Sequence, residues 1–419
     1  MSDTLTVEEL AGALSSTGVE VTPGRSQDAV AGVTAAVVAR PADTAGTSAV
    51  LKVAAERGWR VVARGTGTKL RWGAAPERVD VLLDTSGMAR LLEHAAGDLV
   101  VNVQAGIGLD AVQAAVGEAG QRLALDPLVG PEAAGPGTIG GVIATGASGP
   151  LRLSHGSVRD LLIGVTVVRA DGLVARAGGK VVKNVAGYDL GKLFTGSFGT
   201  LGVITEAIFR LHPLPRTTRW VVHRAPNAAK AHDAVMALVH SQLVPTAIEI
   251  DRPWDGRTTV AVSLEGAEAG VEARVAGAQA VVGGGEVHES APPWWGRPVW
   301  EPGGTALRLT SELAGVAPLL AALDGVGMPV AVRGSAGVGV LHAALPADAE
   351  PDAVAHALAQ LRQQSSRWGG DVVVLDAPAP VRERVDMWGP VRGLALMRRI
   401  KEQFDRERLL APGRFVGGI

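Results

Sequence analysis

The sequence predicts an α+β protein made of a glycine-rich strand–helix region, a second α+β domain and a C-terminal helix. In residues 31–130, short β-branched runs alternate with helical periods. After Pro213 and Pro215, the order strand, helix, strand, strand, helix begins and then recurs, as in a ferredoxin-like fold. The tail has the spacing of an amphipathic helix over residues 393–404, with an apolar face made of Leu394, Leu396, Met397, Ile400 and Phe404.

In the first region, Thr6 and Glu9 have the spacing of a capping box, which predicts a short opening helix. Gly58 and Gly120 are placed to end two later helices. After the opening helix comes an apolar V-A-A-V-type run (31–38), and the elements expected next are a helix (48–57), strands (59–63 and 79–83), a helix (88–95), a strand (99–103) and a helix (109–119).

A long glycine-rich loop should follow, over residues 132–150. Beyond it, Ala170-Asp171-Gly172 predicts the turn of a hairpin between strands 161–169 and 173–176. The remaining expected elements are a helix (187–195), strands (203–211, 219–223, 246–251 and 258–264), helices (228–241 and 270–282), a proline- and tryptophan-rich loop (290–302) and a repeat of the strand–helix theme (306–375).

Composition excludes several classes of function. The 40 Lys and Arg residues nearly balance 42 Asp and Glu without a basic run, so nucleic acid is not an expected partner. The acidic beginning of the chain lacks an apolar signal segment, and no membrane span is predicted, so we expect a cytoplasmic protein. Because the chain has no cysteine, any iron–sulfur partner must be a separate chain.

The stretch E-A-A-G-P-G-T-I-G-G-V-I-A-T-G-A-S-G-P, residues 132–150, is the centre of the argument. Nineteen residues without a formal charge separate Glu132 from Arg152, but the six glycines and two prolines exclude a lipid-facing helix. Glycine at this density marks backbone that turns tightly and approaches another group. Bare backbone N–H groups in a concavity suit an anion, and we expect a diphosphate.

Two further glycine segments accompany this stretch. R-G-T-G-T-K, residues 64–69, follows a predicted strand, and G-S-F-G-T-L-G-V-I-T-E covers residues 196–206. Taken alone, the first segment could simply connect a strand to the next element. The glycines of the other segment could have no role beyond ending a helix. As an ordered triplet, the three segments resemble the FAD-binding domain of the vanillyl-alcohol oxidase / p-cresol methylhydroxylase (PCMH) family over residues 40–212.

A closer resemblance lies in residues 183–204, K-N-V-A-G-Y-D-L-G-K-L-F-T-G-S-F-G-T-L-G-V-I, which are similar to the FAD-binding (E-type) subunits of glycolate oxidases. The tail M-R-R-I-K-E-Q-F-D-R-E-R-L-L-A-P-G-R-F is similar to the ending of that group and of D-lactate dehydrogenases. The usual D-P and N-P-G-R of this ending are Asp405-Arg406 and Ala411-Pro412-Gly413-Arg414 here.

The resemblance implies an α+β fold: a PCMH-type FAD-binding domain of two α/β subdomains, a ferredoxin-like cap and a C-terminal helix. It divides the chain into an N-terminal helical segment (1–30), the FAD-binding domain (31–215), the cap (216–385) and a tail that returns to the FAD-binding domain (386–419). Members that tether FAD covalently often carry histidine where this chain has Thr68, so the resemblance implies non-covalent FAD.

It also implies roles for individual residues. The diphosphate would be held by Arg64, Gly65, Thr66, Gly67, Thr68 and Lys69, through backbone amides and positive charge. The ribityl chain and ring would be lined by Gly137, Thr138, Gly141, Thr145, Gly146, Ala147 and Ser148. The adenosine half would be covered by Gly199, Thr200, Gly202, Val203 and Ile204.

No catalytic residue and no metal site is predicted. Catalytic relatives that oxidise 2-hydroxy acids carry H-A-G-D-G-N-x-H, which supplies a base and metal ligands, whereas this chain has S-A-G-V-G-V-L-H at residues 335–342. Only His342 is kept, and valine offers no ligand, so we interpret His342 as a structural histidine. Phe198 likewise replaces the glutamate of the usual G-S-E-G-T-L-G.

Other polar or aromatic residues near the loops have two interpretations each. Arg152 or Arg414 could clamp a carboxylate or form a structural salt bridge. Tyr188 could bond near the ring, although packing is favoured, and the Trp294-Trp295 pair suits a protein interface or covers the second domain's core. The remaining titratable residues of this region are His155, Arg159 and Asp160.

The sequence is compatible with three functions. The first is an FAD-carrying, non-dehydrogenating subunit that passes electrons between flavin and an iron–sulfur partner in a glycolate oxidase complex. Its partners would be a second, catalytic FAD subunit and a Cys-rich iron–sulfur subunit, with a small 2-hydroxy acid as substrate of the complex and membrane attachment only through partners. The second is a self-sufficient FAD-dependent D-2-hydroxy-acid dehydrogenase with an unrecognised base. The third is a structural subunit with a vestigial flavin site.

Overall fold

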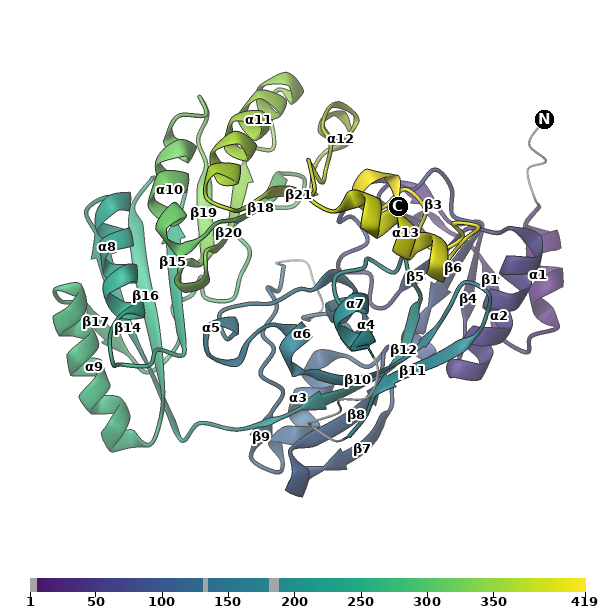
Figure 1. The fold of residues 1–419 in the computed structure, drawn as a ribbon, viewed down its shortest axis with the longest axis horizontal. Coiled ribbons are helices and arrows are strands. Elements are labelled where there is room, and N and C mark those ends of the chain that lie inside the picture. Colours follow the sequence, from purple (N-terminus) through teal and green to yellow (C-terminus); the bar gives the residue numbers. More distant parts are fainter. Residues whose placement is uncertain (1–5, 131–134, 181–187) are drawn as a thin grey trace.

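A four-stranded, a five-stranded and an eight-stranded sheet organise the protein along the chain (Figure 1). The structure is a computed structural model that describes residues 6–130, 135–180 and 188–419. Predicted features at residues 131–134 and 181–187, including the start of the 132–150 stretch, the first residues of the 183–204 resemblance and the first residue of the 187–195 helix, lie outside the described residues.

The first sheet has the order β1 (Glu20–Pro23), β4 (Val37–Arg40), β6 (Val81–Asp84) and β5 (Val61–Arg64). Both β4 and β5 run parallel to β6. The apolar run 31–38 contains β3 (Val33–Thr34), which forms a small hairpin with β2 (Ala29–Val30), and the first two residues of β4.

Two helices, α1 (Val7–Ser15) and α2 (Thr44–Arg57), bury apolar side chains in the core of this first sheet. The predicted capping box is confirmed, because Glu9 N donates to Thr6 Oγ1 at 3.2 Å and Thr6 N donates to the Glu9 carboxylate at 2.9 Å. Gly58 ends α2 with a φ of 67°, a left-handed conformation that glycine adopts readily.

The second sheet is antiparallel, with the order β11 (Val174–Gly178), β10 (Leu162–Val168), β12 (Val203–Arg210), β8 (Val100–Gln104) and β7 (Leu91–Ala95). The predicted hairpin of β10 and β11 is confirmed, and Gly172 in its turn has a φ of 79°. The helices of this part are α3 (Leu109–Gly117), α4 (Ile139–Thr145), α5 (Arg152–His155), α6 (Val158–Leu161) and α7 (Leu190–Phe194).

Two predictions in this region were wrong. Residues 88–95 were expected to be helical, but β7 occupies residues 91–95 and pairs with β8, so hydrogen bonding to a neighbouring strand overrides local helix propensity. The stretch 132–150 was expected to be a loop, but its middle forms α4. The low helix propensity of its glycines argued against this short helix, which begins at the side-chain cap of Thr138.

The eight-stranded sheet, residues 217–376, consists of two ferredoxin-like units and forms most of the cap. Its order is β17 (Glu286–His288), β14 (Thr217–Ala225), β16 (Thr258–Gly266), β15 (Ala247–Arg252), β19 (Ala331–Ser335), β20 (Val340–Leu345), β18 (Thr305–Thr310) and β21 (Val372–Asp376). In each unit the fourth strand lies beside the first, which pairs with the third, and the third pairs with the second. The units join where β15 pairs with β19, so the predicted ferredoxin-like pattern and its repeat are confirmed.

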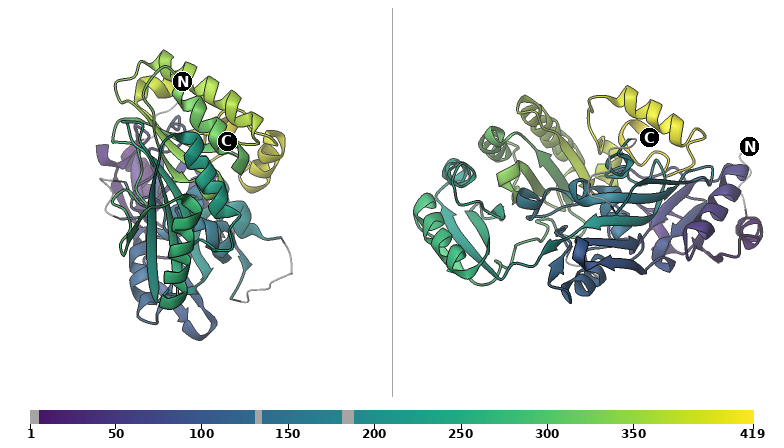
Figure 2. Two further views of the ribbon diagram at one scale, coloured as in Figure 1. Left: turned by 90° about the vertical axis from the view of Figure 1, so that its left-hand side faces the viewer. Right: turned by 60° about the horizontal axis from the view of Figure 1, so that its bottom comes forward.

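Helices cover only one face of the cap sheet (Figures 1 and 2). They are α8 (Ala228–Val239), α9 (Glu268–Val282), α10 (Val316–Asp324) and α11 (Pro351–Arg367). The other face turns toward α5 and the second sheet, where an ion pair joins Arg122 of β9 (Gln121–Arg122) to Glu265 of β16. β9 itself pairs with β13 (His212–Pro213), immediately before the cap begins.

After the cap sheet, α12 (Ala379–Arg384) packs against α11 within the cap, and the tail then runs back across the first two sheets through α13 (Leu394–Phe404). Beyond α13 it extends the first sheet: Val61 N donates to Leu409 O at 2.8 Å, and Ala411 N donates to Val61 O at 2.8 Å.

The predicted apolar face of α13 was wrong at one position. Leu396 is 54% exposed, whereas Lys401 is 1% exposed. Lys401 Nζ donates to Thr200 O at 2.7 Å, to Leu410 O at 2.9 Å and to the Asp405 carboxylate at 2.7 Å. Buried acceptors from the third glycine segment and the tail thus require a charged donor where periodicity predicts none.

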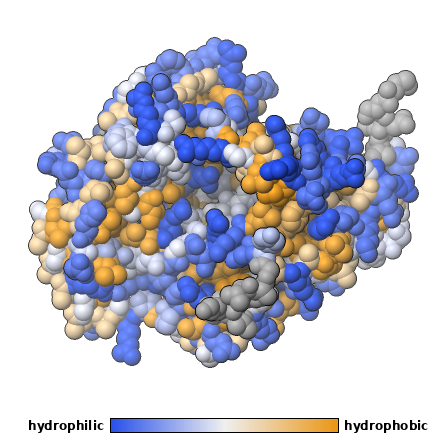
Figure 3. Space-filling view, in the orientation of Figure 1, coloured by the Kyte–Doolittle hydropathy of each residue, from blue (hydrophilic) through white to orange (hydrophobic). Residues whose placement is uncertain are grey.

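Within the described ranges, no helix is at once long enough and apolar enough to cross a bilayer. On the face shown in Figure 3, apolar residues lie in patches among hydrophilic ones.

Candidate cofactor site

The first glycine loop, residues 65–69, follows β5, and most of its backbone N–H groups are unpaired within the described part of the chain. In the part of the chain that the structure describes, the N–H groups of Thr66, Gly67, Thr68 and Lys69 donate no hydrogen bond within the protein. Gly67 has a φ of 81°, a conformation that few other residues adopt. Four such donors in one turn are chemically suited to an anion.

Gly65 brings this loop against the N-terminus of α4. A Cβ on Gly65 would lie 2.1 Å from Thr138 Oγ1, so only glycine allows this approach. Thr138 Oγ1 in turn accepts from Gly141 N at 3.3 Å and caps α4.

Lys69 adds a positive charge between the same two segments. Its Nζ donates to Pro136 O at 3.3 Å and lies 5.8 Å from the ring centroid of Trp72. Burial lowers the pKa of Lys69 to about 8. Gly137 is beside it with a φ of 95°, and a Cβ there would come within 3.2 Å of Lys69 Nζ. An anion at this position would favour the charged form of Lys69.

The third glycine segment is hydrogen-bonded to the end of α4. Gly196 N donates to Ile143 O at 2.9 Å, and Phe198 N donates to Ala144 O at 2.8 Å. Phe198 has a φ of 54°, an uncommon conformation for a bulky residue. Its ring packs against Trp388 and Phe415 at centroid distances of 4.8 and 5.6 Å, so an aromatic cluster stands where the usual motif has a glutamate.

The three segments enclose one pocket, the central pocket, with an empty volume of about 750 Å³, part of it open to solvent. Its size and its few polar groups on an apolar wall are typical of cofactor sites. It is lined by Ala63, Arg64, Gly65, Thr66, Gly67, Thr68, Lys69, Leu70, Thr85, Thr138, Gly140, Gly141, Ala144, Thr145, Phe198, Gly199, Gly202, Val203, Ile204 and Arg414.

Most of the residues proposed from the sequence line this pocket, but five lie behind or beside it. Gly137 contacts the first loop, and Gly146 ends α4 with a φ of 61°. Ala147 and Ser148 follow α4, with Ala147 N donating to Val142 O. Thr200 is buried, and its carbonyl accepts from Lys401.

Arg64 lines the pocket, but its charge is already paired. Its guanidinium donates to Asp28 at 2.6 Å and to Asp84 at 2.7 Å. Although burial acts to lower it, these two carboxylates raise the pKa of Arg64 above its ordinary value. Lys69 and the backbone are therefore better placed than Arg64 to supply positive potential to an anion.

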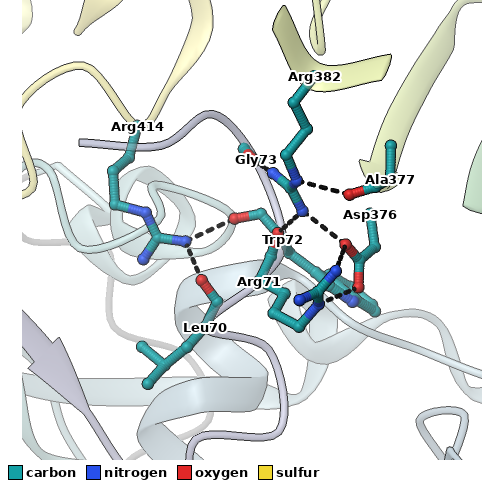
Figure 4. A network of polar contacts seen from close by, with 8 residues as sticks. All are labelled: Leu70, Arg71, Trp72, Gly73, Asp376, Ala377, Arg382 and Arg414. Carbon is teal, nitrogen blue, oxygen red and sulfur yellow. Dashed lines mark hydrogen bonds and ion pairs between the residues drawn. The ribbon is translucent and has the colours of Figure 1, made fainter. Parts of the chain in front are cut away.

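Arg414 belongs to the site in a way that the sequence did not reveal. It forms no ion pair with the residues that the structure describes, and one guanidinium nitrogen donates to Leu70 O at 2.8 Å and to Trp72 O at 2.5 Å (Figure 4). Burial lowers its pKa to about 10. The tail thereby fixes the segment that follows the first glycine loop.

The cap holds the same segment from the other side (Figure 4). Arg382 of α12 donates to Gly73 O at 2.7 Å, to Ala377 O at 2.8 Å and to the Arg71 carbonyl, and it pairs with Asp376 at 2.5 Å. Arg71 pairs with the same carboxylate at 2.9 Å. These partners are about 300 positions apart in the sequence, which is why no local pattern could have identified them.

His342 is on the cap face that turns toward the central pocket, between Arg308 and Arg333 in neighbouring strands. Its ring lies 5.7 Å from that of Trp300, and its Nδ1 has no hydrogen-bond partner among the described residues. Burial, followed by the charges of Arg308 and Arg152, lowers the pKa of His342 to about 3. The imidazole is therefore neutral, and the described residues hold no group of three or more potential metal ligands.

A buried carboxyl that no sequence motif indicated lies on the same face. Glu249 is 3% exposed and accepts a 2.5 Å hydrogen bond from Ser335, the residue that replaces the first histidine of the relatives' motif. Burial raises the pKa of Glu249 to about 8. Nearby Asp126 accepts from Leu151 N, and burial raises its pKa to about 7. The only sequence signal was an acidic residue inside an apolar strand.

Several other candidates do not belong to the site. Tyr188 is 93% exposed, so the expectation that it packs in the interior was wrong. Trp294 and Trp295 pack on the cap, where Trp295 meets Trp220 edge to face at a centroid distance of 6.3 Å. Asp160 caps α6, His155 packs against His212 at 4.7 Å, and Arg159 is exposed beside α4.

Comparison with known proteins identifies the group that this geometry fits. Residues 35–178 match the family model described as FAD binding domain. The chain carries an FAD-binding domain. Unpaired amides, a cradle that a Cβ would fill, and Lys69 are the groups expected around the diphosphate of FAD, which is a cofactor of oxidoreductases.

Curated relatives cover part of the chain. Over 220 residues it is 37% identical to glycolate oxidase subunit GlcD of Bacillus subtilis, covering 52% of this chain and 46% of that protein. The D-lactate dehydrogenase of Archaeoglobus fulgidus is 37% identical over 51% of this chain and 46% of its own length. Glycolate oxidase subunit GlcE of Escherichia coli is 34% identical over 49% of this chain and 55% of its own length. The chain thus spans about half the length of the curated relatives it matches.

Solved structures resemble the whole fold. A chitooligosaccharide oxidase aligns with a TM-score of 0.68 over 96% of this chain and 97% of its own, at 18% sequence identity. An alkyldihydroxyacetonephosphate synthase aligns with a TM-score of 0.69 over 91% and 78% of the two chains, also at 18% identity. The expected α+β fold, an FAD-binding domain of the PCMH type with an antiparallel cap sheet, is therefore confirmed.

Proposed function

We propose that this chain is the FAD-carrying subunit of a glycolate oxidase-type complex and that it passes electrons between flavin and an iron–sulfur partner. The complex would also contain a second FAD subunit, which oxidises a small 2-hydroxy acid, and a Cys-rich iron–sulfur chain. Similarity to the GlcD and GlcE subunits supports this assignment. The predicted cytoplasmic location and the proposed limits of the four parts of the chain belong to the same proposal.

In this proposal, FAD would be bound without a covalent link. Gly65 through Lys69 would hold its diphosphate, and the walls formed by α4 and by residues 199–204 would enclose the remainder. Bound FAD supplies one- and two-electron chemistry, and the chain's own groups position it and tune its potential.

The observation that carries the proposal is the combination of a well-formed central pocket with a cap face that lacks an evident base. Ser335 is engaged by Glu249, whose pKa of about 8 keeps it protonated at neutral pH. His342 is neutral but has the low basicity implied by a pKa of about 3. A site that removes a hydroxyl proton needs a group with higher basicity that reaches the substrate.

The test is anaerobic spectroscopy of the purified lone chain. We expect a yellow protein whose flavin is not bleached by glycolate or D-lactate, with oxidation of glycolate only after the two partner chains are co-expressed. Bleaching of the lone chain would contradict the proposal. A colourless chain that cannot take up FAD would contradict it as well and would support a structural subunit.

A second candidate is a self-sufficient D-2-hydroxy-acid dehydrogenase. Similarity to a D-lactate dehydrogenase supports it, as do two arginines beside the central pocket that form no ion pair with the described residues, discussed below. The same bleaching experiment separates the two candidates, since only this one expects the lone chain to be reduced by substrate.

A further inference from the structure

A second cavity, the anion cavity, lies between the cap and the second sheet. It has an empty volume of about 1090 Å³, part of it open to solvent. Thr145 and Phe198 line both this cavity and the central pocket, so the two are neighbours. A ligand in the anion cavity would therefore lie next to residues that also contact the cofactor space.

Two arginines from opposite sides line this cavity: Arg152 begins α5, and Arg308 is on β18 of the cap. Within the described ranges, neither guanidinium forms an ion pair or donates a hydrogen bond, whereas Arg64, Arg333 and Arg382 each pair with a carboxylate. A partly buried guanidinium without an acceptor carries a desolvation cost that a bound anion would offset.

The surrounding carboxylates offset this positive potential only in part: Glu249, Asp160 and Asp126 act to raise the pKa of Arg152, and Asp371 acts to raise that of Arg308, but burial outweighs them. Burial lowers the pKa of Arg152 and also that of Arg308, which is lowered further by the charge of Arg152. Glu249 is close enough to Arg152 to act on its pKa, but Glu249 is protonated at neutral pH. Asp371 lines the cavity but is exposed to water.

The remaining walls favour an organic acid over an inorganic anion. Val158, Val373, Val391 and Met397 supply apolar surface, with Thr310 as a hydroxyl partner. Two planar guanidinium groups match the two oxygens of a carboxylate, and the apolar side chains would contact a short carbon skeleton.

We propose that Arg152 and Arg308 hold the carboxylate of a small organic acid in the anion cavity, and that the chain binds this acid without oxidising it. The second part of this proposal, that the acid is not oxidised, rests on the function proposed above. The described residues that line this cavity include no histidine and no buried carboxylate: Asp371 is exposed to water, and Glu249, Asp126 and His342 lie outside the lining. A hydroxy acid held there would keep its hydroxyl proton.

The experiment titrates the FAD-loaded full chain with oxalate and with glycolate, by calorimetry and by flavin difference spectra under anaerobic conditions. We expect binding of one equivalent, a shift in the flavin spectrum and no bleaching. In Arg152→Gln and in Arg308→Gln, binding should weaken by about tenfold or more, because each removes one charge-assisted partner. Arg159→Gln is the matched control, since Arg159 lines the same cavity but is exposed.

Two further probes define the ligand. Glycolamide, which lacks the negative charge, should not bind measurably, and inorganic phosphate should bind more weakly than oxalate. Arg308→Lys keeps the charge but not the planar guanidinium, so it should lose less affinity than Arg308→Gln. It also replaces Arg308→Gln in the experiment if the glutamine variant does not fold.

Binding of oxalate that is equal in the wild type, Arg152→Gln and Arg308→Gln, or no binding at all, would overturn the carboxylate site, as would phosphate binding more tightly than every acid. Bleaching by glycolate would overturn the non-oxidising role and the proposed function together, while leaving the arginine clamp intact. If the chain does not bind FAD, the proposed function fails, but the carboxylate site can still be tested. Calorimetry of the FAD-free chain measures whether acid binding depends on the two arginines.

Discussion

Gly65 packs directly against Thr138, the cap of α4. In Gly65→Ala the new Cβ would lie 2.1 Å from Thr138 Oγ1, so Thr138 must move and its cap on Gly141 is lost. We expect FAD affinity to fall by about tenfold or more, since loss of a cap alone costs about 1 kcal/mol and the loop also shifts. Titration of the FAD-free protein with FAD measures this.

Gly117→Ala provides the comparison for this change, because nothing lies within 4 Å of its added Cβ at the end of α3. It should bind FAD as the wild type does. Equal FAD affinity in both variants would remove Gly65 from the cofactor site.

Glu249 gives the protein a pH-dependent stability. The pKa of Glu249 rises from 4.5 in the unfolded chain to about 8 in the fold. Its contribution to the free energy of unfolding is therefore fully present below pH 4.5 and is lost as the pH rises to about 8. The free energy of unfolding should therefore fall with pH in this window, by at most about 1.4 kcal/mol per pH unit from this group. Asp126 acts in the same direction up to about pH 7.

Urea denaturation of Glu249→Gln at pH 5 to 8.5 tests this, since the amide cannot ionise. We expect a flatter pH dependence than in the wild type and greater relative stability at pH 8.5. Glu118→Gln, at an exposed position, should keep the wild-type slope. A slope unchanged by Glu249→Gln would show that Glu249 is ionised in the fold.

At the scale of elements, local patterns predicted most helices and strands and failed where distant partners decide. The capping box at Thr6 and the hairpin turn at Gly172 depend on neighbours in sequence, and both are confirmed. β7 owes its conformation to β8, and Lys401 owes its burial to three acceptors outside α13. A hydrophobic period carries no information about either.

Lys401 is also the test of how α13 is attached. Lys401→Met leaves Asp405 buried without its cation, although Asp405 still accepts from the backbone of Leu409 and Leu410. We expect a loss of about 3 to 5 kcal/mol in the free energy of unfolding, as for other broken buried pairs. Thermal and urea denaturation measure it, with the exposed Arg399→Met as control.

A double variant separates the pair from the helix. Lys401→Met with Asp405→Asn removes both charges, so it should be more stable than Lys401→Met alone. Additive losses in the two single variants would mean that the charges do not interact.

For the whole molecule, sequence reasoning located the glycine loops but not what holds them in place. The three segments that line the central pocket are contiguous motifs, each readable by itself. Arg414, Arg382 and Asp376 act on the first of these from the tail and the cap, across some 300 positions. Such contacts depend on how the sheets are arranged in space, and no local pattern in a single sequence indicates that arrangement.

The Arg382 network leads to the prediction that the cap controls the order of the loop beneath it. In Arg382→Gln, the carbonyls of Arg71 and Gly73 lose their charged donor, while Arg71 keeps its own pair with Asp376. An unpaired buried acceptor costs about 1 to 3 kcal/mol, so residues 70–74 should exchange amide hydrogen faster. FAD affinity should fall by about tenfold, because the first glycine loop immediately precedes this segment.

Arg384→Gln is the matched control, since Arg384 is on the same helix and pairs with Asp352 where both are exposed. It should change neither hydrogen exchange at residues 70–74 nor FAD affinity. If Arg382→Gln alters exchange but not FAD affinity, the cap orders the segment without supporting the cofactor site. If it alters neither, Arg414 alone holds the loop, and the tail rather than the cap connects the distant parts of the molecule to its central pocket.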